Sequence, residues 1–250
     1  MTAEDTARMA SGTAASLSAA EMRLLATMPL HAITSVHGEA GLRERLLLEV
    51  AGFPPADRAR AEDALALASR LHEGDRRQRE PYICHPLRVA IRILSHYRVS
   101  DPDLACAALL HDAVEDHAQG IAPGGARQDA VAVLAGRFGD RVAELVAAVT
   151  NPVYDPGRDK REQYREHVAA SLEASPWARV VKAADFTDNA VGLPYTTGPR
   201  LPELAGKYRP LVPVLRELVL RPDTPLDQAV KDMIAGQLDN AETRLAAITG

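Results

Sequence analysis

The sequence predicts an all-α protein, and three observations support this class. Aromatic residues make up only 4% of the 250 residues, while Ala and Leu are abundant; a chain with few aromatic and β-branched residues favours helices over sheets. Prolines stand where helices would begin, as at Pro86 and Pro102. Apolar residues recur at the spacing of one helix face, as in the series Leu87, Ala90, Ile91 and Leu94.

Each element is predicted from such signals in turn. Residues 1–20 are rich in Ala, Ser and Thr and are expected to be disordered, and residues 21–50 to form one or two short helices with a polar turn near 35–41. Pro54 and Pro55 then end any helix. Further helices are predicted at about 57–72, 85–94, 101–116, 129–137, 139–149, 158–173, 177–192, 203–220 and 225–248. The segments rich in charge, Gly or Pro are predicted to be loops, at 73–81, 118–128, 151–157 and 194–202.

Composition and charge exclude several classes of function. The net charge is −5, from 29 basic and 34 acidic residues, so the chain lacks the basic surface that general nucleic-acid binding needs. No apolar run approaches the length of a membrane span, and the N-terminus lacks the features of a signal peptide. Cys84 and Cys106 form no disulfide framework and suit a reducing compartment. We therefore expect a cytoplasmic protein without a membrane or nucleic-acid partner.

The strongest local motif is the hexapeptide His111-Asp112-Ala113-Val114-Glu115-Asp116. On one continuous helix His111 and Glu115 share a face, and Asp112 and Asp116 share the adjacent one, so all four side chains can converge. A neutral imidazole and carboxylates are metal ligands, and spare carboxylates serve as general acid and base. The seven preceding residues are all apolar or Cys, which places the motif at the edge of a core. Ionisable groups there are costly unless paired or metal-bound; a solvated helix end is the alternative.

Two weaker motifs accompany it. The segment Pro81-Tyr82-Ile83-Cys84-His85-Pro86 places His85 just before a helix-starting proline, where the stiff backbone suits a ligand, with a capping or packed histidine as the alternative. Cys84 is expected to point away from His85 and not to be a ligand. In the segment from Lys182 to Asn189, Asp185 and Asn189 lie one helical turn apart on the same face. Their neighbour Asp188 is expected to be solvated.

Taken together, these motifs resemble those of the HD-domain metal phosphohydrolases, and within them the alarmone hydrolases of the RelA/SpoT type, including the small stand-alone forms. The family pattern is an Arg/Lys pair, P-Y-I-x-H-P, A-A-L-L-H-D-x-x-E-D, F-G-x-x-V-A-x-L-V-x-x-V-T, and K-x-A-D with an Asn four residues on. The order and approximate spacings agree over about residues 58–193. The matching segments are Arg76-Arg77, 81–86, 107–116, 138–150 and 182–189.

The resemblance implies a fold and a set of site residues. The fold is a multi-helix HD-domain bundle at 58–193 with its metal site between core helices, an N-terminal extension at 1–57, and C-terminal helices at 194–250 packed on it. The implied metal ligands are His85, His111, Asp112 and Asp185. The implied acidic pair for the hydrolytic step is Glu115 and Asp116. The implied substrate-binding residues are Arg76, Arg77 and Asn189. Family members usually hold Mn²⁺, and this mixed nitrogen and oxygen set also admits other divalent metals.

The implied activity is removal of the 3′-pyrophosphate of guanosine tetra- or pentaphosphate, which gives GDP or GTP plus pyrophosphate. The metal would acidify a bound water and neutralise a phosphoryl oxygen. Glu115 or Asp116 would orient or deprotonate the water, and the arginine pair would stabilise charge on the pyrophosphate. Arg79, Arg88 and Arg92 would add positive potential near the site. For Arg79 and Arg92, a solvated position on the surface is the alternative.

The chain departs from the family pattern near the third motif. The family often has A-D-R-L-H-N, whereas here Phe186, Thr187 and Asp188 replace the residues between the ligand Asp and the Asn. Two alternatives therefore stay open, a hydrolase for another nucleotide and a non-catalytic nucleotide-sensing domain; retention of both acidic residues argues against the second. His117 is expected to be a solvated loop residue beside an insertion at 118–128. The segment after residue 193 is too short for the synthetase domain of bifunctional members, and the oligomeric state stays open.

Overall fold

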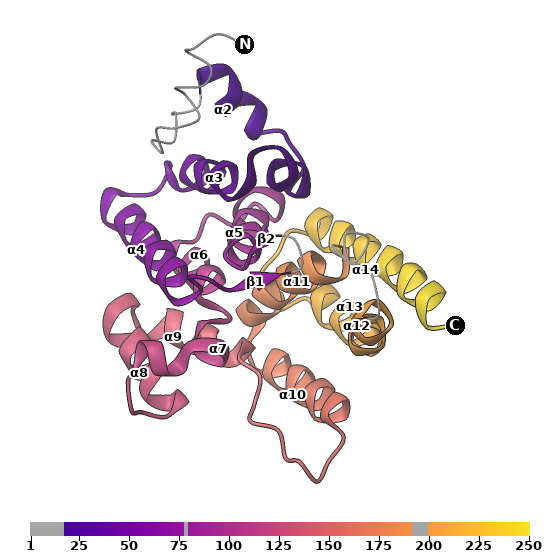
Figure 1. The fold of residues 1–250 in the computed structure, drawn as a ribbon. Helices are drawn as coiled ribbons and strands as arrows, with labels where there is room; N and C mark the ends of the chain where they lie inside the picture. Colours follow the sequence, from indigo (N-terminus) through magenta and orange to yellow (C-terminus); the bar gives the residue numbers. More distant parts are fainter. Residues whose placement is uncertain (1–17, 78–79, 192–199) are drawn as a thin grey trace, which may run out of the picture.

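The computed structural model describes residues 18–77, 80–191 and 200–250. Within them it is a bundle of helices with one short antiparallel hairpin (Figure 1), and the predicted all-α class is confirmed. The α-helices are α2 (Ala19–Leu25), α3 (Leu30–Val50), α4 (Pro55–Leu71), α5 (Cys84–Ile91), α6 (Pro102–Leu110), α7 (Ala113–Ile121), α8 (Arg127–Phe138), α9 (Asp140–Val149), α10 (Lys160–Ala174), α11 (Pro176–Val191), α12 (Arg200–Tyr208), α13 (Val212–Leu220) and α14 (Gln228–Thr249). The remaining elements are strands β1 (Arg76–Arg77) and β2 (Glu80–Pro81), the π-helix η1 (Arg92–His96) and the 3-10 helix η3 (Arg209–Leu211).

Helix α6 forms the centre of the bundle. Its residues 104–110 are all buried, and a helix that is apolar on every side is stable only inside a protein. It packs against α4, α5 and α9, and α11 packs against α5, α6 and α9. Figure 1 shows α5, α6 and α11 together in the middle of the molecule. These three helices hold the chemistry-bearing residues in place.

The flanking helices pack onto this centre. Helix α3 lies against α5, helices α13 and α14 lie against α11, and α12 lies against α14. In Figure 1 the helices α12–α14 are grouped on one side of α11, whereas α7, α8 and α9 are grouped on the other side of the bundle. The segments expected as N-terminal and C-terminal extensions therefore contact the helices that carry the site.

Several predicted boundaries differ from the structure. The turn expected near 35–41 is a kink inside α3 at Gly38, where φ is 63°, a value that residues with a Cβ rarely adopt. The helix expected at 203–220 is divided into α12, η3 and α13, because Pro210 and Pro213 lack the backbone N–H that a continuous helix needs. Residues 18–20 were expected to be disordered, but Ser18 caps α2 by accepting a hydrogen bond from the Glu21 amide. The rest of that segment, and residues 194–199 of the predicted loop, lie outside the described residues.

The prediction that residues 111–116 lie on a single helix is wrong. Helix α6 ends at Leu110 and α7 begins at Ala113, so His111 and Asp112 occupy the turn between them. Nδ1 of His111 bonds to the carbonyl oxygen of Ala108 at 2.8 Å. A polar side chain that bonds to a carbonyl of the preceding turn competes with the helix ladder and often bends the helix. Helix α7 then runs to Ile121, into the predicted loop at 118–128.

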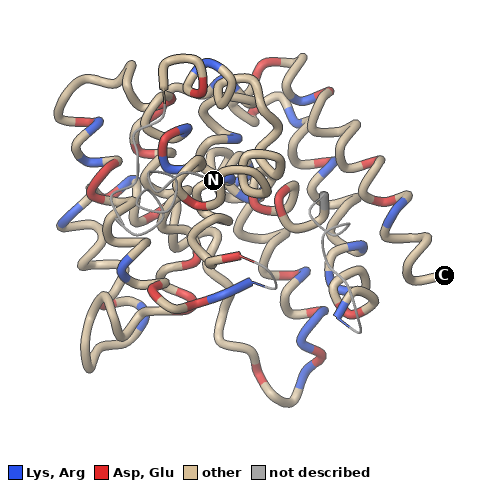
Figure 2. Tube along the Cα trace, turned by 45° about the horizontal axis from the view of Figure 1, so that its top comes forward, with Lys and Arg blue, Asp and Glu red and all other residues tan. Residues whose placement is uncertain are grey.

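Charge is spread over the whole molecule. Figure 2 shows acidic and basic residues interspersed along the described elements. This distribution agrees with the small net charge of −5. Among the described helices, none combines the length and the apolar character that crossing a lipid bilayer requires.

Candidate metal centre

Four predicted ligands meet between α5, the α6–α7 turn and α11. Nε2 of His85 lies 3.2 Å from Oδ1 of Asp185 and 3.6 Å from Oδ2 of Asp112. Nε2 of His111 lies 3.2 Å from Oδ2 of Asp112 and 3.8 Å from Oδ1 of Asp185. Metal–ligand bonds of about 2.1 Å separate neighbouring ligand atoms by about 3.0–3.4 Å. The donor atoms of His85, His111 and Asp185 all lie within 4.8 Å of one another, and Oδ2 of Asp112 lies within 3.6 Å of Nε2 of both histidines, an arrangement that can hold one divalent ion.

The environment of His111 provides a further test of that fit. Because Nδ1 bonds to the Ala108 carbonyl, the proton of the neutral ring belongs on Nδ1 and the lone pair of Nε2 faces the carboxylates. Nε2 is buried, and Oδ2 of Asp112 lies 3.2 Å from it. A cation between these donors would occupy Nε2 in place of a proton.

Asp188 lies behind His85, and the expectation that it is solvated is wrong. Its side chain is buried, and its Oδ2 lies 2.8 Å from Nδ1 of His85. Nε of Arg88 donates to Oδ1 of Asp188 at 2.9 Å. A carboxylate that accepts the Nδ1 proton of a ligand histidine fixes the ring and raises its basicity. Asp188 therefore orients Nε2 of His85 toward the other donors, a role that sequence spacing did not reveal.

Two arginines expected to add positive potential are instead neutralised inside the protein. Arg88 is buried and donates to Asp188 and to both carboxylate oxygens of Glu80, at 2.9 and 2.7 Å. Arg92, for which a solvated position was the alternative, is also buried, with Nη1 3.4 Å from Oδ1 of Asp188. The positive charges of Arg88 and Arg92 are therefore compensated inside the protein, in both cases by the Asp188 carboxylate. Arg79 lies outside the described residues.

Lys182 orients the side chain of Asp185, the last of the four predicted metal ligands. Its Nζ donates to Oδ2 of Asp185 at 2.9 Å, and the pair is buried. The other oxygen, Oδ1, faces the two histidines. Burial alone would raise the pKa of Asp185, but the neighbouring Lys182 outweighs it and holds that pKa below its usual range. Asp185 is therefore ionised, as a ligand must be.

Asp112 lies on the solvent side of the cluster. Its side chain is 21% exposed, whereas those of His85, His111 and Asp185 are 1%, 3% and 9% exposed. The hydroxyl of Tyr82 donates to Oδ2 of Asp112 at 2.8 Å. Burial and the charge of Asp112 raise the pKa of Tyr82, so the phenol stays protonated as a donor. Asp112 is therefore the donor of this cluster that is most open to solvent.

Arg77 and Asn189 connect the hairpin to the cluster. Nη2 of Arg77 donates to Oδ1 of Asn189 at 2.6 Å, and Nδ2 of Asn189 donates to Oδ1 of Asp185. The guanidinium of Arg77 also lies 5.4 Å from the centre of the Tyr82 ring. Arg76, its neighbour on β1, is exposed. The structure therefore brings Arg77 and Asn189 to the metal-binding cluster and leaves Arg76 on the surface beside it.

Glu115 and Asp116 lie on the first turn of α7. Oε1 and Oε2 of Glu115 accept hydrogen bonds from the side chain and the backbone of Asn151, at 3.0 and 3.2 Å. Partial loss of solvent, followed by the charges of Asp112 and Glu115, raises the pKa of Asp116. The two acids thus differ, since one is fixed by hydrogen bonds and the other has an increased proton affinity.

His117 is not the solvated loop residue that was expected. It lies within α7 and contacts His72 and Asp75, residues that are 45 and 42 positions away in the chain. The sequence offered no local signal for this cluster, because its members come from three separate elements. Cys84 is buried and free, as is Cys106.

Comparisons with known proteins identify the domain that carries this cluster. A family model of the HD domain matches residues 64–175. The chain is 37% identical over 134 residues to guanosine-3′,5′-bis(diphosphate) 3′-pyrophosphohydrolase MESH1 of Homo sapiens, with 52% of this chain and 67% of that protein covered. It is 31% identical over 142 residues to the Drosophila melanogaster protein of the same name, with 56% and 72% covered. The match to the Aquifex aeolicus guanosine-3′,5′-bis(diphosphate) 3′-pyrophosphohydrolase is 32% over 154 residues, 61% of this chain and 20% of the relative.

A solved structure shares the fold. It is described as that of a metazoan ortholog of SpoT, and it aligns with a TM-score of 0.55 and 24% identity over 74% of this chain and 95% of that chain. The helical bundle and its His/Asp cluster define an HD-domain protein, a class built around a divalent metal. Within that class, the chain belongs to the RelA/SpoT-type alarmone hydrolase family. It spans about a fifth of the length of the bacterial relative and about two thirds of the human one.

Proposed function

We propose that this protein is a Mn²⁺-dependent hydrolase that removes the 3′-pyrophosphate from guanosine tetra- or pentaphosphate. One observation carries the proposal. Arg77, which suits a phosphate, is joined through Asn189 to Asp185 of the four-donor cluster, so substrate binding and metal binding are held in one hydrogen-bonded unit. The relatives named above act on guanosine 3′,5′-bis(diphosphate).

The metal would be held by His85, His111, Asp112 and Asp185. When bound, a divalent ion supplies Lewis-acid chemistry, which withdraws charge from a phosphoryl oxygen and makes water more acidic. Manganese suits a set of two imidazoles and two carboxylates. Lys182 and Asp188 keep two of these ligands in orientation, through Asp185 and His85 respectively.

The acidic pair moves the proton. In the proposed step a water molecule adds to the phosphorus on the ribose 3′ oxygen, and the bond from that phosphorus to the 3′ oxygen breaks. Asp116, whose pKa is raised, accepts the proton of the attacking water and is suited to return it to the 3′ oxygen. Glu115, fixed by Asn151, orients the water. Arg76 and Arg77 bind the departing pyrophosphate through paired N–H groups.

The altered third motif supports an alarmone substrate over another nucleotide. Phe186, Thr187 and Asp188 are all buried. Phe186 packs edge-on against Tyr208, with ring centres 5.8 Å apart, and Thr187 bonds back to the Ala183 carbonyl at 2.7 Å. These side chains are occupied inside the protein, so their divergence from the family pattern changes the support of the site more than its substrate-facing surface.

We further propose that the enzyme acts in the cytoplasm, without a nucleic-acid or membrane partner. Both cysteines are buried and unpaired in disulfides, which suits a reducing compartment. The net charge of −5 and the acidic and basic residues interspersed along the trace in Figure 2 do not favour a polynucleotide partner.

The proposal is tested by adding Mn²⁺ to chelator-treated protein and measuring pyrophosphate release from guanosine tetraphosphate and from a panel of other nucleotides. We expect release from the alarmone alone. An Asp112→Ala variant should lose it, whereas Asp232→Ala, an exposed acid on α14, should not. Faster turnover of another nucleotide would replace the proposed substrate, and binding without turnover would indicate a sensor. Normal hydrolysis by Asp112→Ala would overturn the metal assignment.

Substrate binding by Arg77 is tested separately. Replacing Arg77 with Ala removes a charged hydrogen-bonding group worth about 2 kcal/mol, which corresponds to roughly a 30-fold loss in kcat/KM. We expect most of this loss to appear as an increase in KM. Arg58→Ala, on the exposed side of α4, is the matched control and should leave KM unchanged.

A further inference from the structure

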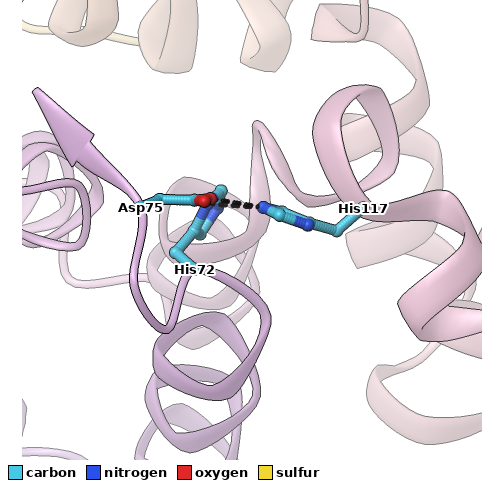
Figure 3. Close-up of side chains that lie close together, drawn as sticks. All are labelled: His72, Asp75 and His117. Carbon is cyan, nitrogen blue, oxygen red and sulfur yellow. Dashed lines mark hydrogen bonds and ion pairs between the residues drawn. The ribbon is translucent and has the colours of Figure 1, made fainter.

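A second cluster of metal-ligating side chains lies outside the proposed active site. It consists of His72 at the end of α4, Asp75 just before β1, and His117 on α7. Figure 3 shows the Asp75 carboxylate and the His72 ring meeting the ring of His117 across the space between α4 and α7. None of these residues belongs to the four-donor cluster, and none was assigned a chemical role above.

The donor atoms of this cluster converge on one point. Nε2 of His117 lies 2.7 Å from Oδ2 of Asp75 and 3.0 Å from Nδ1 of His72, and the last two atoms are 3.2 Å apart. Tetrahedral Zn²⁺ with bonds of about 2.05 Å has neighbouring ligand atoms about 3.3 Å apart. The three donors thus form one face of such a tetrahedron after a small outward movement of the side chains.

The type of donor restricts the ion. Two imidazoles and one carboxylate form a borderline set that suits Zn²⁺ and neighbouring transition metals. Calcium and magnesium prefer oxygen ligands. The fourth position of a tetrahedral ion would face solvent, because the Asp75 and His117 side chains are 41% and 25% exposed. A surface pocket of about 300 Å³, lined in part by His72 and Asp75, gives access from one side.

The surroundings hold the ligands in place. His72 is buried, and its ring stacks on that of Tyr82 with centres 4.5 Å apart. Asp75 is fixed through its backbone, because its carbonyl oxygen accepts from the Tyr82 amide at 3.0 Å. At His117 the backbone leaves helical geometry, with φ −133° and ψ 31°, and its ring meets that of His72 edge-on. Ligands that are ordered before binding lose less entropy when an ion arrives.

We propose that His72, Asp75 and His117 form a second transition-metal site, of the Zn²⁺ type, with water as the fourth ligand. The ion would join the hairpin to α7. Asp75 directly precedes β1, which carries Arg76 and Arg77, while His117 directly follows Glu115 and Asp116. Occupancy therefore fixes the distance between the basic pair and the acidic pair. The proposal does not depend on the substrate of the enzyme.

The experiment is equilibrium dialysis of chelator-treated full-length protein against Zn²⁺, followed by measurement of metal per chain. We expect two equivalents for the unmodified protein and one for His117→Ala and for Asp75→Asn. His111→Ala should also bind one, and the His111→Ala, His117→Ala double variant should bind none. His37→Gln, which changes a histidine outside both clusters, should still bind two.

A second measurement separates the proposal from a simple hydrogen-bonded His/Asp cluster. We expect Zn²⁺ to slow hydrogen exchange of the Tyr82 amide at least about 10-fold in His111→Ala and to have no such effect in the double variant. With Co²⁺ as the probe, the visible absorption of a tetrahedral ion should be present in His111→Ala and absent in the double variant. No Zn²⁺ bound by a folded His111→Ala variant, or two equivalents bound by a folded Asp75→Asn variant, would overturn the proposal.

Discussion

Nδ1 of His85 lies 2.8 Å from Oδ2 of Asp188, a residue 103 positions further along the chain. This contact turns Nε2 of His85 toward Asp112 and Asp185. Asp188 is fixed in turn by Arg88. The orientation of one proposed metal ligand therefore depends on a buried ion pair between α5 and α11.

The first prediction concerns this support. Asp188→Asn keeps the shape of the side chain but removes the negative charge that accepts the Nδ1 proton of His85. We expect the affinity for Mn²⁺ to fall roughly 10–100-fold, measured by competition with a chelating dye. Asp232→Asn is the control and should bind like the unmodified protein. If Asp188→Asn unfolds at the same temperature as the unmodified protein without metal and binds Mn²⁺ equally well, the positioning role is excluded.

The second prediction concerns the roles of Glu115 and Asp116 in the hydrolytic step. Glu115→Gln and Asp116→Asn should each lower kcat by about 10²–10⁴-fold while Mn²⁺ per chain stays unchanged. The charge of Glu115 is one of the causes that raise the pKa of Asp116. Its removal should therefore lower that pKa and move the acid limb of the kcat–pH profile to lower pH. A loss of Mn²⁺ from either variant would place that acid among the ligands and contradict this assignment.

The third prediction follows from the charge of the metal-free cluster. Burial lowers the pKa of His111, but Asp112 outweighs it and raises the pKa from 6.5 to about 9. Because the pKa of His111 is higher in the folded state than in the unfolded state, protonation of His111 stabilises the folded protein. This contribution to the free energy of unfolding is complete below pH 6.5 and is lost as the pH rises through about 9. Thermal unfolding of the chelator-treated protein should therefore show a decreasing Tm between pH 6.5 and 9.

Metal binding should remove that dependence. A bound ion occupies Nε2 of His111 in place of the proton, so its addition near pH 7.5 should release a proton. The release is measured by calorimetry in buffers of different ionisation enthalpy. A His111→Gln variant should release correspondingly fewer protons. A metal-free Tm that rises between pH 6.5 and 9 would show that His111 is not protonated in the folded state.

The fourth prediction concerns stability alone. Arg179 on α11 is completely buried and donates to the carbonyl oxygens of Leu172 and Glu173, at 2.7 and 3.0 Å, and to Asp223 at 2.8 Å. Arg179→Met leaves these carbonyls without their donor and should cost about 3 kcal/mol of unfolding free energy. Urea unfolding measures this loss.

The matched control is Arg221→Met. Arg221 also pairs with Asp223, but it lies at the surface, so its replacement should change the unfolding free energy by less than about 0.5 kcal/mol. Both variants should keep the same Mn²⁺ content, because neither residue contacts the four-donor cluster. Equal stability of the two variants would show that burial of Arg179 contributes little.

The sequence by itself determined the helical class, and its resemblance to a known family named the histidines and carboxylates that we propose as metal ligands. Apolar spacing defines helix faces locally, so the helices of the core were predictable from runs such as residues 104–110, which are buried throughout. The motif residues His85, His111, Asp112 and Asp185 were also predictable, because each motif is continuous in the chain. Local patterns failed where a side chain competed with the backbone, as at His111, whose bond to Ala108 divides the predicted helix.

Only the tertiary structure decided which polar residues face one another. Asp188 looked solvated in a local pattern, yet the packing of α11 on α5 places it against His85 and Arg88. His72, Asp75 and His117 meet because α4 packs on α7, across 42 to 45 residues of sequence. Helical periodicity states which face of a helix is apolar. It does not state which other helix covers that face or at what register, and that choice determines the environment of every buried charge.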